Sequence, residues 1–176
     1  MTTAIMTDEL FRVGKWSIQN LSLTYEKAQI LWDKYNEHKT LFTDLSKGNI
    51  DNWVRYVTNP DSFWLEIIDT TNGETVGLIY FNDMEQIVDI EMHAVIFDRQ
   101  PAEKLEVLRE TLRWMFENFP INRITGPTAA IYFRTMRLLE RAGFKNEGTK
   151  REAMLIGGKW VDTVWYGITR SEVEKT

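Results

Sequence analysis

The clearest pattern in the chain is an alternation of apolar and polar residues over 87–97. The apolar members of this run are Val88, Ile90, Met92, Ala94 and Ile96. The polar residues between them include Asp89, Glu91 and His93. Because successive side chains of a strand point to opposite faces, the pattern predicts a strand with one apolar and one polar face.

Two further strands are predicted just before this one. Residues 62–83 contain two apolar runs, separated by Asn72 and Gly73. Asn-Gly suits the positive φ angles of a tight turn, so the segment predicts a hairpin. Nearer the N-terminus, residues 9–20 predict a first strand.

Two helices are expected between the first strand and the hairpin. Ser22 can cap a helix over 24–38, where apolar residues recur at helical spacing. A shorter helix fits 49–58. Its apolar face consists of Ile50, Trp53, Val54 and Val57.

Helices and strands alternate in the second half of the chain. Pro101 suits the start of a helix that runs to about 117, because the first turn does not need the missing N–H. Its apolar face consists of Leu105, Leu108, Leu112 and Met115. A short strand at 122–127, an amphipathic helix at 130–142 and closing strands at 145–155 and 159–169 follow. This order indicates the α/β (α+β) class, a mixed sheet with helices on its faces.

The composition fits one domain that spans residues 1–176. A hydrophobic content of 43% excludes a disordered chain. The absence of cysteine argues against disulfides and thiolate metal sites, and we expect a reducing, cytoplasmic location. We see no signal peptide or membrane span. The net charge of -5 argues against broad nucleic-acid binding and mildly favours cationic partners or substrates.

The most specific motifs lie in the last quarter of the chain. They are LLERAGF at 138–144, NEGTKRE at 146–152 and GGKWVDTVWYGITRSE at 157–172. This succession resembles the GNAT superfamily of N-acetyltransferases, and more narrowly the branch that acetylates ribosomal protein N-termini, polyamines and some antibiotics. Further matching residues are Glu106, Leu108, Arg109, Phe116, Glu117, Asn122, Arg123 and Ile124.

The resemblance implies a GNAT-like mixed, mostly antiparallel sheet of about seven strands flanked by about four helices. It implies acetyl-CoA as the cosubstrate and a primary amine as the acceptor, either a protein N-terminus or a small molecule. Direct attack is expected, because the chain has no cysteine nucleophile. The alternative is an inactive GNAT-fold protein that serves as a binding or structural component. A homodimer or a place in a larger assembly fits either reading.

The loop that holds the pyrophosphate in this superfamily is altered here. Its usual pattern is Arg/Gln-x-x-Gly-x-Gly/Ala, which presents backbone N–H groups at a helix N-terminus. This chain has Arg99, Gln100, Pro101, Ala102 and Lys104 there, and proline removes one N–H donor. The charges of Arg99 and Lys104 can partly offset the loss. A merely solvated Lys104 is the alternative.

The resemblance also implies that backbone around Val95 to Phe97 pairs with the pantetheine. At the next helix, Thr135 keeps a hydroxyl that can meet the cofactor, whereas Tyr132 replaces the asparagine common in the branch.

Glu91 is the expected base that removes a proton from the amine, with His93 as second choice. Both share the polar face of the predicted strand with Asp89. The alternative is an ordinary polar strand face. Three ligands along one flat strand diverge, so we expect no metal site.

Several motif residues have structural explanations. Gly143 can cap a helix and Phe144 can fill the core, while Trp160 and Tyr166 are expected to pack. Three aromatic residues of the first helices either line an acceptor pocket or, as we favour, belong to the core. They are Trp32, Trp53 and Tyr56.

Overall fold

The computed structural model describes residues 9–37, 49–84, 88–97 and 101–173, and their side chains except at 35–37 and 101–102. The elements are β1 (Glu9–Val13), β2 (Trp16–Asn20), α1 (Tyr25–Glu37), α2 (Ile50–Val57), β3 (Phe63–Asp69), β4 (Glu74–Asn82), β5 (Asp89–Ile96), α3 (Pro101–Asn118), β6 (Arg123–Ala129), α4 (Phe133–Ala142), β7 (Lys145–Ile156), β8 (Lys159–Thr169) and α5 (Arg170–Val173).

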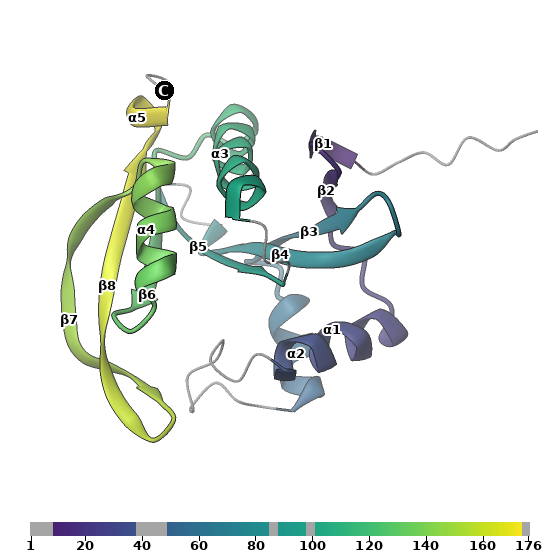
Figure 1. Ribbon diagram of the computed structural model, residues 1–176, viewed down its shortest axis with the longest axis horizontal. Helices are drawn as coiled ribbons and strands as arrows, with labels where there is room; N and C mark the ends of the chain where they lie inside the picture. Colours follow the sequence, from purple (N-terminus) through teal and green to yellow (C-terminus); the bar gives the residue numbers. More distant parts are fainter. Residues whose placement is uncertain (1–8, 38–48, 85–87, 98–100, 174–176) are drawn as a thin grey trace, which may run out of the picture.

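The strands form one sheet in the order β1-β2-β3-β4-β5-β6-β8-β7. Every neighbouring pair is antiparallel except β5 and β6, which run parallel. The predicted fold class is confirmed, although the described residues form eight strands and five helices where about seven and about four were expected. In Figure 1, β3, β4 and β5 run across the view while β6, β7 and β8 stand upright.

The predicted single strand at 9–20 is wrong, because the segment is a hairpin. Gly14 has a φ of +56°, a left-handed conformation that glycine adopts without steric cost. The chain therefore reverses at Gly14 and Lys15, and β2 pairs with both β1 and β3. Trp16 and Ile18 of β2 are fully buried, and burial of such a side chain contributes roughly 1.5–3 kcal/mol.

Side chains at the helix starts fix where the helices begin. Thr24, and not the predicted Ser22, caps α1: its Oγ1 accepts a hydrogen bond from the Lys27 N–H at 3.2 Å. Asn49 caps α2 in the same way, accepting from the Asn52 N–H at 3.0 Å. The expected helix at 130–142 begins three residues later, at Phe133.

Helices cover both faces of the sheet. Residues of α3 and α4 pack in the larger apolar cluster with Ile79, Ile90 and Ile124 of the strands. Residues of α1 and α2 pack in a second cluster on the opposite face, with Trp64 and Leu78. None of the helices in the described part of the chain is long and apolar enough to cross a membrane.

The closing motifs are built mostly as expected. Gly143 ends α4 at a φ of +106°, and Phe144 is buried. Tyr166 is buried as well, and its hydroxyl donates to Glu140 Oε1 at 3.0 Å. The expectation that Trp160 packs is wrong, because 59% of it is exposed. It is the second residue of β8, just after the Gly157–Gly158 turn that joins β7 and β8.

Candidate active site

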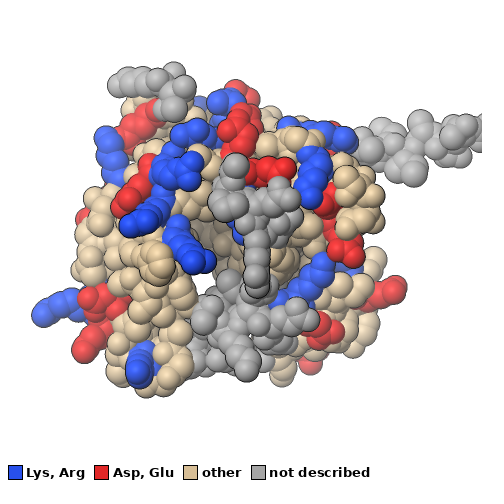
Figure 2. Space-filling view, viewed as in Figure 1, with Lys and Arg blue, Asp and Glu red and all other residues tan. Residues whose placement is uncertain are grey.

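The parallel strands β5 and β6 open into a fork. Their pairing ends at Glu91 and Thr125, although β5 continues to Ile96 and β6 to Ala129. The two halves of the sheet diverge here in Figure 1, and Figure 2 shows the surface hollowed between them. Strand backbone without a neighbouring strand offers N–H and C=O groups to a ligand.

The backbone groups of β5 point alternately toward β4 and toward the fork. The Phe97 N–H donates to Val76 O at 2.6 Å, on the β4 side. The Met92 carbonyl faces β6, since a Cβ built on Gly126 lies 3.6 Å from Met92 O. By this alternation Val95 turns the same way as Phe97. The pantetheine contact expected around these two residues stays a prediction, and the fork-facing groups belong to their even-numbered neighbours.

Lys104 lies at the far end of the fork, in the first turn of α3. Its Nζ donates to Ile96 O at 3.3 Å, so positive charge lies where β5 ends and α3 begins. Its expected phosphate contact stays a prediction. Arg99 and Gln100 lie outside the described residues, as does the side chain of Ala102.

Helix α4 brings further positive charge to this side of the molecule. Thr135 is exposed in its first turn, and Tyr132 precedes the helix without a side-chain cap hydrogen bond. Figure 2 shows Lys and Arg side chains gathered over α4. The exposed arginines of this helix are Arg134, Arg137 and Arg141.

Glu91 and His93 form a close pair where the fork begins. Glu91 Oε1 lies 2.6 Å from His93 Nε2, and each side chain is 26% exposed. Glu91 is the last residue of β5 that pairs with β6, whereas His93 lies beside the opening. The structure therefore brings the two predicted catalytic residues together at one point that solvent reaches.

A stack of aromatic rings holds the His93 imidazole. Tyr80 lies opposite His93 in the β4–β5 register, and the two ring centroids are 4.7 Å apart. The other face of Tyr80 stacks on Trp64 of β3 at 4.0 Å. The sequence does not indicate Tyr80 or Trp64 as site residues, because their place beside His93 depends on the register between three strands.

Tyr56 of α2 closes the stack from the side. Its ring meets Trp64 and Tyr80 edge-on at 5.7 Å, and its hydroxyl accepts a hydrogen bond from Asn82 Nδ2 at 2.8 Å. Burial raises the pKa of Tyr56, and the Glu91 charge raises it further. Tyr56 thus stays protonated at neutral pH. The expectation that it belongs to the core is wrong, because 39% of the residue is exposed.

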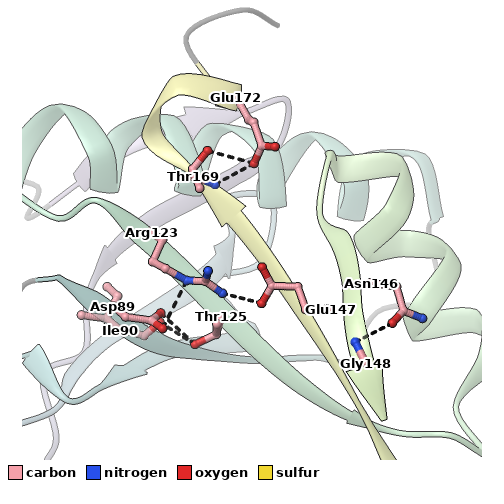
Figure 3. Close-up of polar contacts among 9 residues, drawn as sticks. All are labelled: Asp89, Ile90, Arg123, Thr125, Asn146, Glu147, Gly148, Thr169 and Glu172. Atoms are coloured by element: carbon pink, nitrogen blue, oxygen red, sulfur yellow. Dashed lines mark hydrogen bonds and ion pairs between the residues drawn. The ribbon is translucent and has the colours of Figure 1, made fainter.

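Asp89 shares the strand face with Glu91 but is bound elsewhere (Figure 3). Its Oδ2 lies 3.2 Å from Arg123 Nε, and its Oδ1 accepts from the Thr125 hydroxyl at 3.1 Å. Arg123 also pairs with Glu147 of β7, and this hydrogen bond raises the pKa of the guanidinium. Of the two carboxylates, Glu91 therefore offers the better-placed base.

Arg123 and Glu147 lie flat across β8 because Gly167 leaves room for them. A Cβ at Gly167 would lie 2.5 Å from Glu147 Oε1 and 2.6 Å from Arg123 Nη2. The ion pair thus ties β6 to β7 across the strand between them, next to the fork.

Comparisons with known proteins give relatives that are named N-acetyltransferases. No family model matches the chain. The SPbeta prophage-derived uncharacterized N-acetyltransferase YokL of Bacillus subtilis is 23% identical over 172 residues, covering 92% of this chain and 97% of that protein. The [Ribosomal protein uS5]-alanine N-acetyltransferase of Escherichia coli is 27% identical over 115 residues, covering 61% of this chain and 58% of that protein.

Solved structures share the fold. Spermidine N-acetyltransferase from Vibrio cholerae, in complex with CoA and spermine, superposes with a TM-score of 0.74 at 15% identity, covering 91% of this chain and 98% of that one. Ribosomal-protein-S5-alanine acetyltransferase from Vibrio fischeri gives 0.72 at 13% identity, covering 92% and 97%. The resemblance predicted from the sequence is confirmed: the chain has the GNAT fold, and its relatives are N-acetyltransferases.

Proposed function

From this fold, we propose that the chain transfers an acetyl group from acetyl-CoA to a primary amine, by direct attack of the amine. The observation that carries the proposal is the Glu91–His93 pair at the start of the β5–β6 fork. It combines a proton acceptor with a place where a ligand can pair with open strand backbone.

Three features of the fork suit acetyl-CoA, the acetyl donor. The open backbone of β5 can hydrogen-bond an extended amide chain, as a strand would. The N-terminus of α3 and the Lys104 ammonium provide positive charge for phosphate groups. The exposed arginines of α4 add to that charge. When bound, acetyl-CoA supplies the activated acetyl group.

Glu91 and His93 are placed to remove the proton from the acceptor amine. An amine is protonated at neutral pH and must lose a proton before it can attack a carbonyl carbon. The Glu91 carboxylate can take this proton, directly or through water, while His93 Nε2–H donates to Glu91 Oε1. The ring stack of Tyr80 and Trp64 keeps the imidazole in this orientation.

The names of the relatives support an amine acceptor for this chain, but they do not identify which amine it is. One is named for the alanine of a ribosomal protein, and a structural neighbour is a spermidine acetyltransferase. A protein N-terminus and a small amine are therefore the two acceptor classes to test.

The altered loop favours a second candidate, an inactive GNAT-fold protein that acts as a binding or structural component. Pro101 lacks an N–H where the superfamily uses backbone donors for the pyrophosphate. Under this reading, the fold and the Glu91–His93 pair remain while affinity for the cosubstrate is lost.

Calorimetric titration with acetyl-CoA separates the two candidates. We expect saturable binding, and we expect Lys104→Ala to weaken it several-fold, because one charged contact to phosphate is lost. Arg113→Ala is the matched control: it removes an exposed cation of the same helix that pairs with Glu110. Absence of heat at millimolar acetyl-CoA would contradict the enzyme and support the inactive component.

A further inference from the structure

Thr163 and Trp165 lie on the same face of the sheet as the Glu91–His93 pair. Their neighbours in β8 alternate with them and pack in the apolar cluster under α3 and α4. These neighbours are Val164, Tyr166 and Ile168. In β5, Ile90 and Met92 belong to that same cluster. The odd-numbered residues of both strands therefore face the other way, toward the side of α1 and α2.

Both side chains carry a buried polar atom without a partner. Thr163 is only 3% exposed, and its Oγ1 has no hydrogen-bond partner among the described residues. The Trp165 Nε1 is buried and equally unpaired within the described part of the chain. Buried polar groups are almost always paired, so two neighbouring exceptions on one strand face indicate that something else binds there.

Lys150 adds a charge at the same place. Its Nζ lies 4.2 Å from the centre of the Trp165 ring, and its residue is opposite Thr163 in the β7–β8 register. The indole N–H and the ammonium can only donate hydrogen bonds, and the threonine hydroxyl can donate as well. The three groups therefore select an oxygen acceptor, such as a carbonyl or a carboxylate.

The register gives the distance of this group from the catalytic pair. Glu91 lies opposite Thr125, and Thr125 lies opposite Gly167, two residues from Trp165. Two strand spacings amount to about 10 Å, and the fork adds to that distance. With the two-residue offset along β8 the separation is about 12 Å, and since an extended peptide advances ~3.3 Å per residue, about four residues join the two places.

We propose that Thr163, Trp165 and Lys150 form a subsite for a backbone carbonyl of the acceptor, which is a peptide with a free amino terminus. The proposal rests on the proposed function and chooses between its two acceptor classes. A peptide can place its amine at Glu91 and a later carbonyl at the donors of β8. A protonated polyamine offers no acceptor, would leave the Trp165 N–H unpaired and would be repelled by Lys150.

Kinetics with two kinds of acceptor test the subsite. The probes are a pool of ten-residue peptides that vary at the first three positions, and spermidine. Trp165→Phe removes the N–H and keeps a ring, and Thr163→Val removes the hydroxyl at nearly constant shape. We expect each to raise the peptide KM about tenfold with kcat nearly unchanged, the loss of one hydrogen bond. Trp160→Phe, at the exposed tryptophan of the same strand, should change neither.

A binding measurement keeps the test independent of turnover. The indole N–H resonance of Trp165 is assigned by its absence in Trp165→Phe, and we expect it to shift when peptide is added but not with spermidine. Shifts without any acetylation would sink the proposed function and keep the subsite. Efficient acetylation of spermidine in preference to every peptide would overturn the subsite, as would an unchanged peptide KM in both variants.

Discussion

At the scale of single residues, the role of each carboxylate on β5 depends on its neighbours. Glu91 and Asp89 are two residues apart on one strand face, and the alternation alone does not distinguish them as bases. In the structure, Asp89 is held by Arg123 and Thr125, whereas Glu91 pairs with His93. The sequence could show that these side chains share a face, because alternation is local. It could not show Tyr80 beside His93, because that contact depends on strand register.

Replacement of Glu91 by glutamine tests the base directly. Glu91→Gln keeps the shape and removes the proton acceptor, so we expect kcat to fall about 10²–10⁴-fold. Acetyl-CoA affinity by calorimetry should stay near that of the unmodified chain. Asp89→Asn is the control, and it should retain most of the turnover, since that carboxylate is bound to Arg123 and Thr125. Unchanged turnover in Glu91→Gln would remove Glu91 as the base.

At the scale of elements, the sequence predicted the existence of the strands better than the gaps between them. Periodicity placed β5 and β6, but it could not show that their pairing ends at Glu91 and Thr125. Strand backbone that lacks a neighbouring strand produces no recognisable pattern of side chains in the sequence. The hairpin at 9–20 was missed for a related reason: Gly14 and Lys15 form a turn that looks like strand when only the apolar positions are counted.

The glycine of β8 gives a sharp test of how the strands beside the fork are tied together. A Cβ in Gly167→Ala would meet Glu147 and Arg123 at 2.5–2.6 Å, so the ion pair must move. The atoms in the way are the ends of two flexible, partly exposed side chains, so we expect the free energy of unfolding to fall by only about 0.5–1 kcal/mol, the usual contribution of an exposed ion pair. Gly126→Ala is the matched control, since its Cβ would meet nothing closer than 3.6 Å. Equal stability of the two variants in urea denaturation would contradict this account.

At the scale of the whole molecule, ionised carboxylates fasten both ends of the described chain to the sheet. Near the N-terminal end, Lys15 in the turn between β1 and β2 donates to Asp69 Oδ2 at the end of β3, at 2.8 Å. Near the C-terminal end, Glu172 of α5 pairs with Lys145 and accepts from the Thr169 N–H at 2.9 Å. The Lys15 hydrogen bond lowers the pKa of Asp69 from 3.8 to about 2, and the Lys145 hydrogen bond lowers that of Glu172 from 4.5 to about 2.

These two carboxylates should make the fold sensitive to acid. A carboxylate whose pKa is lower in the folded chain stabilises it fully above the unfolded pKa, and this stabilisation disappears as the pH falls toward the folded value. We therefore expect the thermal midpoint to fall between about pH 4.5 and pH 2, with a shallower fall in the Asp69→Asn, Glu172→Gln double variant. That variant should also melt lower at neutral pH. Glu74→Gln, at an exposed carboxylate without an ion pair among the described residues, is the control. The same slope in the double variant and in the unmodified chain, followed by circular dichroism, would show that other groups govern the acid transition.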